Sequence, residues 1–374
     1  MAGRAAPPGR QRSGPGAGGA AVTRDEPPAG NATTPAAGDA TTDPVDDATL
    51  ALLVEVAGTP KPGNVDRRRD LDDLRFEAFL GGAVGARPGL ELAAGKEAAG
   101  RAVVGETPAV GDAFEQAVKG MAARAGTNTQ FGCLLLLVPL VRAAADPGRE
   151  LAPDGLDAVC RATTVDDAVA FYRAFEAVDV AVDDPPPGAA DLDVRRGSDA
   201  EPALRERGMT LRDVLALSAE PGGSAEAADS GDPDRVPDRN AAEWTEGFPR
   251  TFRAAEWILT DEGPLADRAA RAFLGLLAAE PDTLVASTRG AETAHEASGR
   301  ARALLTGGAD GSDPAGPLGD IGAIDAVAVH GADLDAAESL AEAFVAEGIN
   351  PGTTADLTCA ALFVALRRGA EVAP

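Results

Sequence analysis

Apolar residues recur every three to four positions along most of this chain. Within residues 47–57, Leu50, Leu53, Val54 and Ala57 form one apolar stripe with the period of a helix. Such a stripe predicts an amphipathic helix with one face against a core. The same reasoning predicts helices over residues 71–84, 89–104, 109–125, 129–145, 165–178, 211–219, 241–260, 265–279, 292–305, 334–347 and 355–368.

The segment 129–145 is apolar almost all round, which is typical of a central helix. Pro139 within it predicts a kink or an early end, because proline lacks a backbone N–H. Strand signals are weak: the best candidate is 324–330 (IDAVAVH), and aromatic residues, which favour strands, make up 4% of the chain. We therefore predict an all-α fold, a single multi-helical domain of roughly a dozen helices.

Three threonines have the spacing of helix starts. Thr164, Thr210 and Thr353 each precede an aspartate by three positions. A threonine hydroxyl can accept a hydrogen bond from the first turn of a helix, and the acidic side chain can return one to the cap. We expect helices to begin at these three positions.

The chain divides by composition into a tail and a domain. Residues 1–44 are rich in Gly, Ala, Pro and Thr and have almost no large apolar side chains, which predicts a disordered, low-complexity tail. Residues 45–374 carry the helical pattern and are expected to form the functional domain. Two further stretches without periodicity, near 220–240 and 307–322, are expected to be loop insertions.

The charge of the chain excludes several kinds of partner. Lys and Arg total 34 and Asp and Glu total 60, which gives a net charge of −26. A chain this acidic repels the phosphates of nucleic acids and the surfaces of anionic membranes. The longest apolar run, CLLLLVPLV at 133–141, is too short to span a bilayer, and the first residues are not a secretory signal. We expect a cytoplasmic protein.

Two residue types refine this expectation. Lysine occurs only at three positions among many acidic residues, which is typical of a halophilic protein that needs salt to screen its own charge. The three cysteines, Cys133, Cys160 and Cys359, have no CxxC spacing and lie in apolar surroundings. They are expected to be buried thiols in a reducing compartment.

Several common chemistries are absent from the sequence. It contains no phosphate-binding P-loop, no glycine-rich dinucleotide motif and no serine nucleophile elbow. The two histidines, His295 and His330, belong to no zinc-binding pattern. Any catalysis must therefore depend on carboxylates, Asn, Thr, Arg and Lys, with Mg²⁺ as the metal that prefers such oxygen ligands.

The richest polar segment is 55–73 (EVAGTPKPGNVDRRRDLDD). Lys61 stands between two prolines, and Arg67 follows closely, so that a stiff turn presents cations suited to a phosphate. Carboxylates at Asp66, Asp70 and Asp72 interleave with them, which suits Mg²⁺ held together with a polyphosphate. A solvated turn with mixed charges explains the same residues.

Two other polar segments each precede a predicted helix. In 126–132 (GTNTQFG), Asn128 or Thr129 can cap the apolar helix, whose first amides also form an anion site. In 350–356 (NPGTTAD), Thr353 can cap the last helix. Helix capping explains both segments about as well as ligand binding does.

Together these segments carry a resemblance. TPKPGNVDR (59–67), TNTQFGCLLLLVPL (127–140) and NPGTTADL (350–357), in this order, resemble the triphosphoribosyl-dephospho-coenzyme A synthase family. The run RRRD at 67–70 and the pair QF at 130–131 differ from the bacterial pattern and resemble an archaeal, haloarchaeal-type branch. The similarity extends from about residue 46 to the C-terminus.

The resemblance implies an all-helical transferase. Such enzymes move the triphosphoribosyl group of ATP to the 2′-hydroxyl of 3′-dephospho-CoA and release adenine. The product is the precursor of the prosthetic group on the carrier subunits of citrate lyase and malonate decarboxylase. The resemblance thus implies ATP and dephospho-CoA as substrates and enzymes of the acyl carrier protein pathway as partners.

The implied reaction passes through an oxocarbenium-like transition state and suggests roles for the motif residues. The acceptor hydroxyl needs a base, for which Asp66 or Asp70 is expected, and Glu55 or Asp356 would balance positive charge at C1′. Mg²⁺ is expected on Asp66, Asp70 and Asp72. Substrate binding is expected from Lys61, Asn64, Arg67, Asn128, Thr129, Asn350, Gly352, Thr353 and Asp356.

Two alternatives stay open from the sequence. One is a Mg²⁺-dependent nucleotide or ADP-ribosyl hydrolase on a helical fold, and the other is a non-catalytic helical binding protein. The transferase hypothesis requires the three distant segments to meet around one nucleotide.

Overall fold

The computed structural model describes residues 42–97, 101–102, 109–185, 188–219, 236–306 and 324–372. Residues 37–374 belong to one compact unit. The predicted tail lies outside the described residues up to position 41, as do positions 220–235 and 307–323 of the predicted insertions. Those domain boundaries therefore remain predictions.

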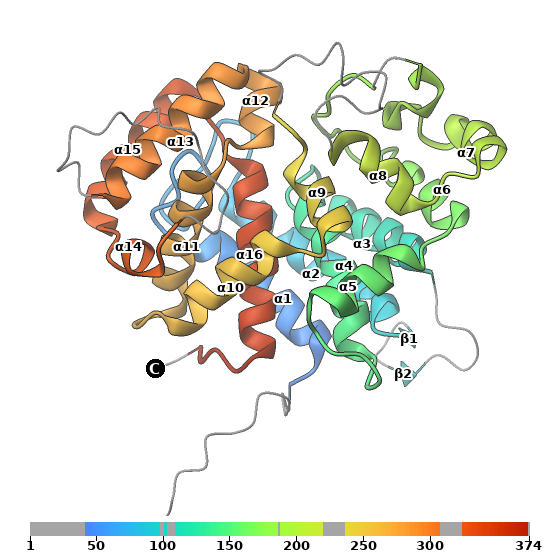
Figure 1. Ribbon diagram of the computed structural model, residues 1–374, viewed down its shortest axis with the longest axis horizontal. Helices are drawn as coiled ribbons and strands as arrows, with labels where there is room; N and C mark the ends of the chain where they lie inside the picture. The colour runs from blue at the N-terminus through green and yellow to red at the C-terminus, as the bar shows by residue number, and fades with distance from the viewer. Residues whose placement is uncertain are drawn as a thin grey trace, which may run out of the picture. The chain divides into compact units, whose positions relative to one another are not determined.

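The fold is all-α, as predicted, and the described residues form a single helical domain (Figure 1). Short 3₁₀ helices η1 (Ala190–Leu192) and η2 (Val194–Ala200) and a hairpin of the two-residue strands β1 (Lys96–Glu97) and β2 (Arg101–Ala102) accompany the α-helices. The sixteen α-helices in the described part of the chain are α1 Pro44–Ala57, α2 Phe76–Ala93, α3 Val110–Ala125, α4 Phe131–Ala145, α5 Pro153–Arg161, α6 Val165–Ala174, α7 Glu201–Arg207, α8 Leu211–Ala219, α9 Arg239–Glu246, α10 Pro249–Thr260, α11 Leu265–Ala279, α12 Thr283–Arg289, α13 Ala291–Leu305, α14 Ala326–His330, α15 Leu334–Glu347 and α16 Gly352–Arg367.

Three predicted elements differ from the structure. The segment 324–330 is not a strand: Asp325 accepts a hydrogen bond from the Val327 amide and starts the helix α14. The two helices predicted over 71–84 and 89–104 are instead the single helix α2 followed by the β hairpin. This helix continues through a proline because its neighbours supply the packing, and it ends just before Gly95, which has a positive φ.

Helix boundaries elsewhere depend on glycine and proline. The helix predicted over 241–260 is divided into α9 and α10 at Gly247, whose φ is 82°, and Pro249 occupies the first turn of α10. Pro139, by contrast, does not end α4, and the prediction of an early end there was wrong.

Two of the three predicted threonine caps are formed. Thr164 forms a capping box with Asp167, and Thr210 exchanges the same pair of hydrogen bonds with Asp213. Thr353 does not cap α16, because the helix already begins at Gly352. Its hydroxyl instead accepts a hydrogen bond from the Leu284 amide at 3.3 Å.

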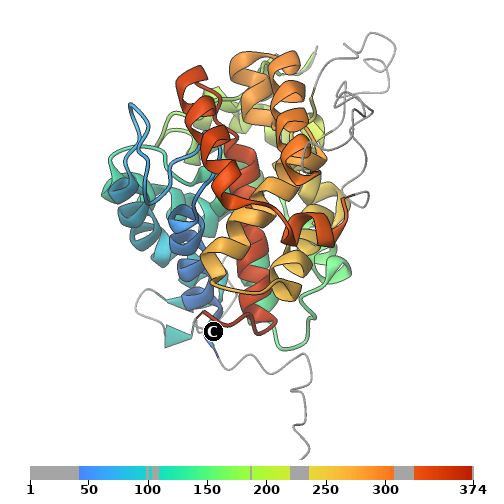
Figure 2. The ribbon, with the colours of Figure 1, turned by 90° about the vertical axis from the view of Figure 1, so that its left-hand side faces the viewer.

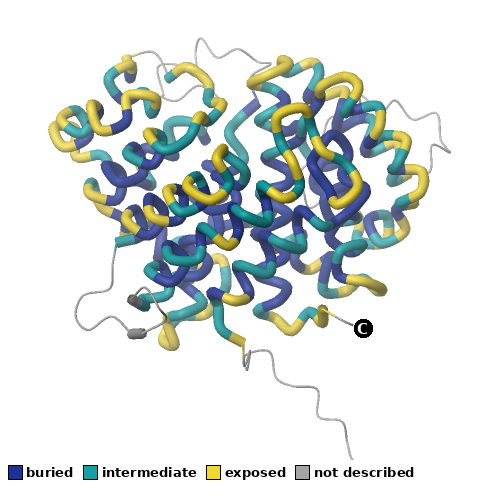
Figure 3. Tube along the Cα trace, turned by 180° about the vertical axis from the view of Figure 1, so that it is seen from behind, coloured by how far each residue is buried: buried dark blue, intermediate teal, exposed yellow. Residues whose placement is uncertain are grey.

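Helix α16 runs through the centre of the domain, with α1, α4, α10 and α11 packed around it (Figures 1 and 2). Its side chains from Thr353 to Leu366 are buried with the exception of Asp356, which is partly exposed overall although its carboxyl is enclosed. Seen from behind, the buried trace is concentrated in this central region and the exposed trace on the outer helices (Figure 3). The predicted central helix, α4, is likewise buried along most of its length.

The described part of the chain contains no helix long and apolar enough to cross a membrane. The three cysteines are free and buried, as predicted.

Helices α2 and α3 approach each other closely through glycines. A Cβ atom placed on Gly85 would lie 2.2 Å from the Gly120 carbonyl oxygen, and one placed on Gly120 would lie 2.1 Å from that of Gly85. A side chain at either position would therefore push two backbones apart. This contact fixes the helix pair that packs against α4.

We expect Gly120→Val to lower the free energy of unfolding by about 3 kcal/mol, because the new side chain overpacks a backbone contact. Ala123→Leu on the exposed face of the same helix is the control and should change stability by about 0.5 kcal/mol or less. Urea unfolding in molar KCl measures both. Equal stabilities for the two variants would contradict this account of the α2–α3 contact.

Candidate active site

Three segments that are distant in sequence meet at one cavity of about 310 Å³. Glu55 at the end of α1 lines it, as does Asn64 from the turn that follows. The segment before α4 and the start of α16 complete this part of the wall. Of the residues proposed from sequence, the cavity wall contains Glu55, Asn64, Asn128, Thr129, Asn350, Gly352, Thr353 and Asp356.

The other proposed residues, Lys61, Asp66, Arg67, Asp70 and Asp72, are not among the described residues of the wall. Arg67 and Asp72 are exposed. Asp70 accepts a hydrogen bond from the Phe76 amide at 2.8 Å and thereby caps the start of α2. The structure does not bring the proposed metal ligands Asp66, Asp70 and Asp72 together: no three His, Cys, Asp or Glu side chains are placed to share a metal ion in the described ranges.

Asp66 holds its own turn together. Its buried carboxylate accepts hydrogen bonds from the Thr59 hydroxyl at 2.8 Å, the Arg68 amide at 2.8 Å and the Arg69 guanidinium at 2.6 Å, as well as a longer one from the Lys61 amide. These four donors account for both oxygens. Asp66 therefore shapes the turn that follows α1 and does not face a substrate.

Lys61 points inward and not outward as the sequence suggested. Its ammonium group forms an ion pair with Glu55, and the two side chains are 1% and 2% exposed. Burial raises the pKa of the Glu55 carboxyl, and the attraction of Lys61 opposes that shift. Glu55 is thus a carboxylate of the cavity wall with a buried cation directly behind it.

The turn that carries Lys61 is locked against the start of α16. Gly63 has a φ of 74°, and a Cβ atom there would lie 1.9 Å from the Ile349 carbonyl oxygen. The Asn64 amide donates hydrogen bonds to the Asn350 side chain at 2.9 Å and to the Pro351 carbonyl at 3.2 Å. These contacts explain why both segments need their particular residues, and they fix one side of the cavity relative to the other.

Asp356 is a second carboxyl of the wall whose pKa is raised. Its Oδ2 accepts a hydrogen bond from Asn240 Nδ2 at 2.8 Å, and its Oδ1 accepts one from Cys133 Sγ at 3.2 Å. Burial raises its pKa to about 7, and the charge of Glu55 adds to this shift. Near neutral pH Asp356 can therefore hold a proton and release it.

A glycine makes this arrangement possible. A Cβ atom on Gly132 would lie 1.9 Å from Asp356 Oδ2 and 2.7 Å from Asn240 Nδ2. The carboxyl and the amide thus fit against the first turn of α4 only where that turn lacks a side chain. The sequence placed Gly132 in a capping segment and gave no sign of this steric role.

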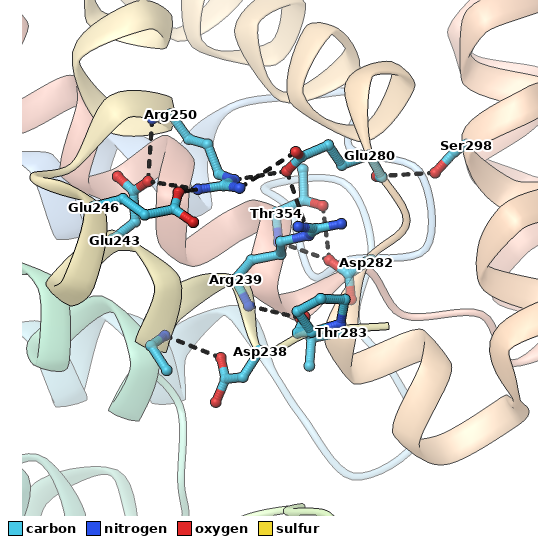
Figure 4. Close-up of polar contacts among 12 residues, drawn as sticks. Asp238, Arg239, Glu243, Glu246, Arg250, Glu280, Asp282, Thr283, Ser298 and Thr354 are labelled. Carbon is cyan, nitrogen blue, oxygen red and sulfur yellow. Dashed lines mark hydrogen bonds and ion pairs between the residues drawn. The ribbon is translucent and has the colours of Figure 1, made fainter. Parts of the chain in front are cut away.

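Ion pairs and hydrogen bonds link residues of α9, α10 and α16 and of the segment between α11 and α12 (Figure 4). Buried Asp282 accepts hydrogen bonds from the amide and hydroxyl of Thr354, both at 2.7 Å, in the first turn of α16. Arg250 of α10 bonds Glu280 at 2.6 Å and Glu246 of α9 at 2.8 Å. Arg250 thus joins α9 and α10 to the end of α11, and Asp282 joins the start of α16 to the start of α12.

The cavity has two chemically different parts. One part of its wall is apolar, with these side chains from α4, α6, η2, α8 and the segment between α6 and η2: Phe131, Phe171, Tyr172, Phe175, Val180, Val182, Leu192, Val194, Leu215 and Leu217. Its charged residues are all acidic among the described residues that line it: Glu55, Asp183, Asp184, Asp193, Asp238 and Asp356. An anionic ligand therefore needs a cation that the described wall does not supply.

Sequence reasoning missed two of these residues. Cys133 lies inside the second motif but was interpreted as core, because its surroundings are apolar. Asn240 lies outside all three motifs, at the start of α9, and only its position in space connects it to Asp356.

Lys61→Met should lower the free energy of unfolding by about 3–5 kcal/mol, because it leaves the buried Glu55 carboxylate without its cation. The double variant Lys61→Met/Glu55→Leu is the matched control and should regain most of this loss, since it removes both charges. Chemical unfolding in molar KCl compares the three proteins. A single variant as stable as the wild type would show that the ion pair is not formed.

Comparison with known proteins identifies the family and a similar fold. Residues 42–373 match the family model CitG, described as ATP:dephospho-CoA triphosphoribosyl transferase. A crystal structure from Archaeoglobus fulgidus, provisionally named triphosphoribosyl-dephospho-coA synthase, has a similar fold with a TM-score of 0.52 and 21% sequence identity. The likeness covers 78% of this chain and 99% of that one. No curated protein matches the sequence significantly.

Proposed function

Because this chain belongs to the ATP:dephospho-CoA triphosphoribosyl transferase family, it transfers the triphosphoribosyl group of ATP to dephospho-CoA, and we propose that the transfer takes place in the cavity described above. The observation that carries this proposal is the convergence of Glu55, Asn128 and Asp356 from three distant segments on one cavity. A cavity of about 310 Å³ is of the size that small-molecule sites have.

Asp356 is assigned as the general acid. Transfer breaks the bond between C1′ of the ribose and N9 of adenine, and the departing base needs a proton to leave as neutral adenine. A carboxyl with a pKa of about 7 is protonated in a large fraction of molecules at neutral pH and gives up its proton readily. Its hydrogen bonds to Asn240 and Cys133 hold it in place.

Glu55 is assigned as the carboxylate that assists formation of the new bond between C1′ and the acceptor oxygen. Of the two carboxyls Glu55 and Asp356, Glu55 is the one that contacts a cation, Lys61. This contact favours the charged form of Glu55 relative to an isolated buried acid. As a carboxylate it can accept the proton of the acceptor hydroxyl while oxygen bonds to C1′, and its charge offsets the positive charge that develops there. Asp66, which was the candidate base from sequence, is replaced in this role because its oxygens are occupied.

Mg²⁺ is proposed to accompany the triphosphate. The described wall holds six carboxylates and neither Lys nor Arg, so that a triphosphate needs a divalent cation to enter it. Mg²⁺ commonly takes one or two protein carboxylates and completes its shell with phosphate oxygens and water. Carboxylates of the wall other than Glu55 and Asp356 would hold it, and the ion would offset the charge of the phosphates.

The setting of the reaction is also a proposal. We assign the enzyme to the cytoplasm, where ATP is available and where three free buried thiols stay reduced. Its product would be consumed by enzymes that attach a prosthetic group to an acyl carrier protein. The acidic composition supports a salt-rich interior as the working condition.

Purified protein incubated with ATP, dephospho-CoA and MgCl₂ in molar KCl should release one adenine for each CoA derivative that gains a triphosphoribosyl group. Mass spectrometry identifies both products. EDTA should abolish the reaction, because the triphosphate then meets six carboxylates without a cation. Release of ribose triphosphate or inorganic phosphate with unmodified dephospho-CoA would instead indicate a hydrolase.

We expect kcat/KM for ATP to fall as the pH rises through about 7, because a general acid works only while it holds its proton. Asp356→Asn cannot supply that proton and should lower kcat about 10²- to 10⁴-fold. The control is Asp154→Asn, which alters an exposed carboxylate that is not part of the described cavity wall and should keep the wild-type pH profile. A wild-type rate that rises through pH 7 would assign Asp356 as a base.

A further inference from the structure

Asn240 has an unused hydrogen-bond acceptor at the cavity. The residue is 8% exposed, and its side chain forms part of the cavity wall. Its Nδ2 donates to Asp356, whereas its buried Oδ1 has no hydrogen-bond partner among the described residues. Leaving a buried acceptor unsatisfied is destabilising, because the atom has lost its hydrogen bonds to water. A ligand that donates a hydrogen bond at this point would remove that cost.

The neighbouring Asp356 supplies the complementary group. Its Oδ2 is engaged by Asn240, and its Oδ1 receives only the weak donor Cys133 Sγ. A proton on Oδ1 makes this atom a donor beside the vacant acceptor of Asn240. The donor and the acceptor thus belong to two side chains that are joined through their other atoms by a 2.8 Å hydrogen bond and that both pack against Gly132.

This pair matches one edge of adenine. The N7 atom of adenine accepts a hydrogen bond, and the adjacent 6-amino group donates one. Guanine and hypoxanthine present the same N7 but have an oxygen at position 6, which would face the Asn240 oxygen with no hydrogen between them. Of the purines, only a 6-amino purine satisfies both groups of the wall.

We infer that Asn240 selects adenine nucleotides: its Oδ1 accepts a hydrogen bond from the 6-amino group while Asp356 Oδ1 gives its proton to N7. The inference rests on the proposed function and adds base selection to it. The step balances, because the electron pair of the C1′–N9 bond passes to the purine ring as the proton arrives at N7. Adenine then leaves as a neutral tautomer.

A ribose hydroxyl is the other donor that could approach Asn240, and it makes a different prediction. Every purine nucleotide carries the same ribose, so that loss of such a contact would weaken all of them equally. Loss of a contact to the 6-amino group weakens ATP and leaves a 6-oxo nucleotide unaffected. The ratio of kcat/KM for ATP and ITP therefore separates the two.

The experiment measures kcat/KM for ATP and ITP with dephospho-CoA, in wild type and in Asn240→Ala and Asn240→Ser. Wild type should prefer ATP at least 100-fold, because ITP leaves buried polar groups unpaired. Both variants should lower this ratio at least 10-fold, mainly through a loss with ATP. An unchanged ratio, or a wild type that uses both nucleotides equally, would overturn the inference.

The matched control is Asn128→Ala in the same cavity. Both ends of the Asn128 amide are already engaged, by the Asp179 carbonyl and the Phe131 amide, so that its loss should leave the ATP-to-ITP ratio unchanged. Circular dichroism and thermal unfolding show whether each variant is folded. If Asn240→Ala does not fold, Asn240→Ser, which keeps a small polar group, provides the test. Absence of any transfer from ATP by wild type would instead count against the proposed function.

The pH profile provides a readout that a purely structural role of Asn240 would not move. Its Nδ2 stabilises the charged form of Asp356 and thereby lowers the pKa of that carboxyl. In the folded Asn240 variants the fall in kcat/KM for ATP should shift to higher pH. A profile that keeps the wild-type midpoint would show that Asn240 does not contact the acid in solution.

Discussion

The site is organised around the burial of one carboxyl at the start of a helix in the middle of the domain. Among the described residues no cation contacts Asp356, and its hydrogen-bond partners are an amide and a thiol. Removing a carboxylate from water without a counter-charge is costly, and the protein responds by favouring the protonated form near neutral pH. The chemistry that a nucleoside bond requires follows from this placement.

The surrounding structure holds the ends of several helices in one place. The first turn of α16 is fixed by Asp282 on one side and by the turn at Asn64 on the other. The turn itself is shaped by Asp66, so that this residue contributes without reaching the cavity. A buried ion pair at Lys61 then sets the electrostatics of Glu55. Two carboxyls of the same wall thereby acquire different surroundings, which suits an acid and an acceptor of protons.

The absence of basic side chains from the described wall is consistent with the composition of the chain. A protein with a net charge of −26 has an excess of acidic side chains, and its lysine in the first motif is committed to Glu55. The proposed Mg²⁺ would offset the charge of the substrate in such a wall. The acidic cavity therefore reflects the same excess of Asp and Glu that makes the whole chain acidic.

Most helices and the three motifs were readable from the sequence, because helical periodicity and turn chemistry are local properties. Local signals failed where packing decided the outcome, as in the helical segment 326–330 and in α2, which continues through its proline. For the site, the sequence placed Asn64 and Asp356 in motifs that resemble one family and made Glu55 a candidate, but it oriented Lys61 wrongly and gave no sign of Asn240. Lys61 turns inward because the packed domain buries it together with Glu55, and Asp356 finds its partner Asn240 at a distance of 116 positions in the sequence, so only the tertiary structure decides either contact.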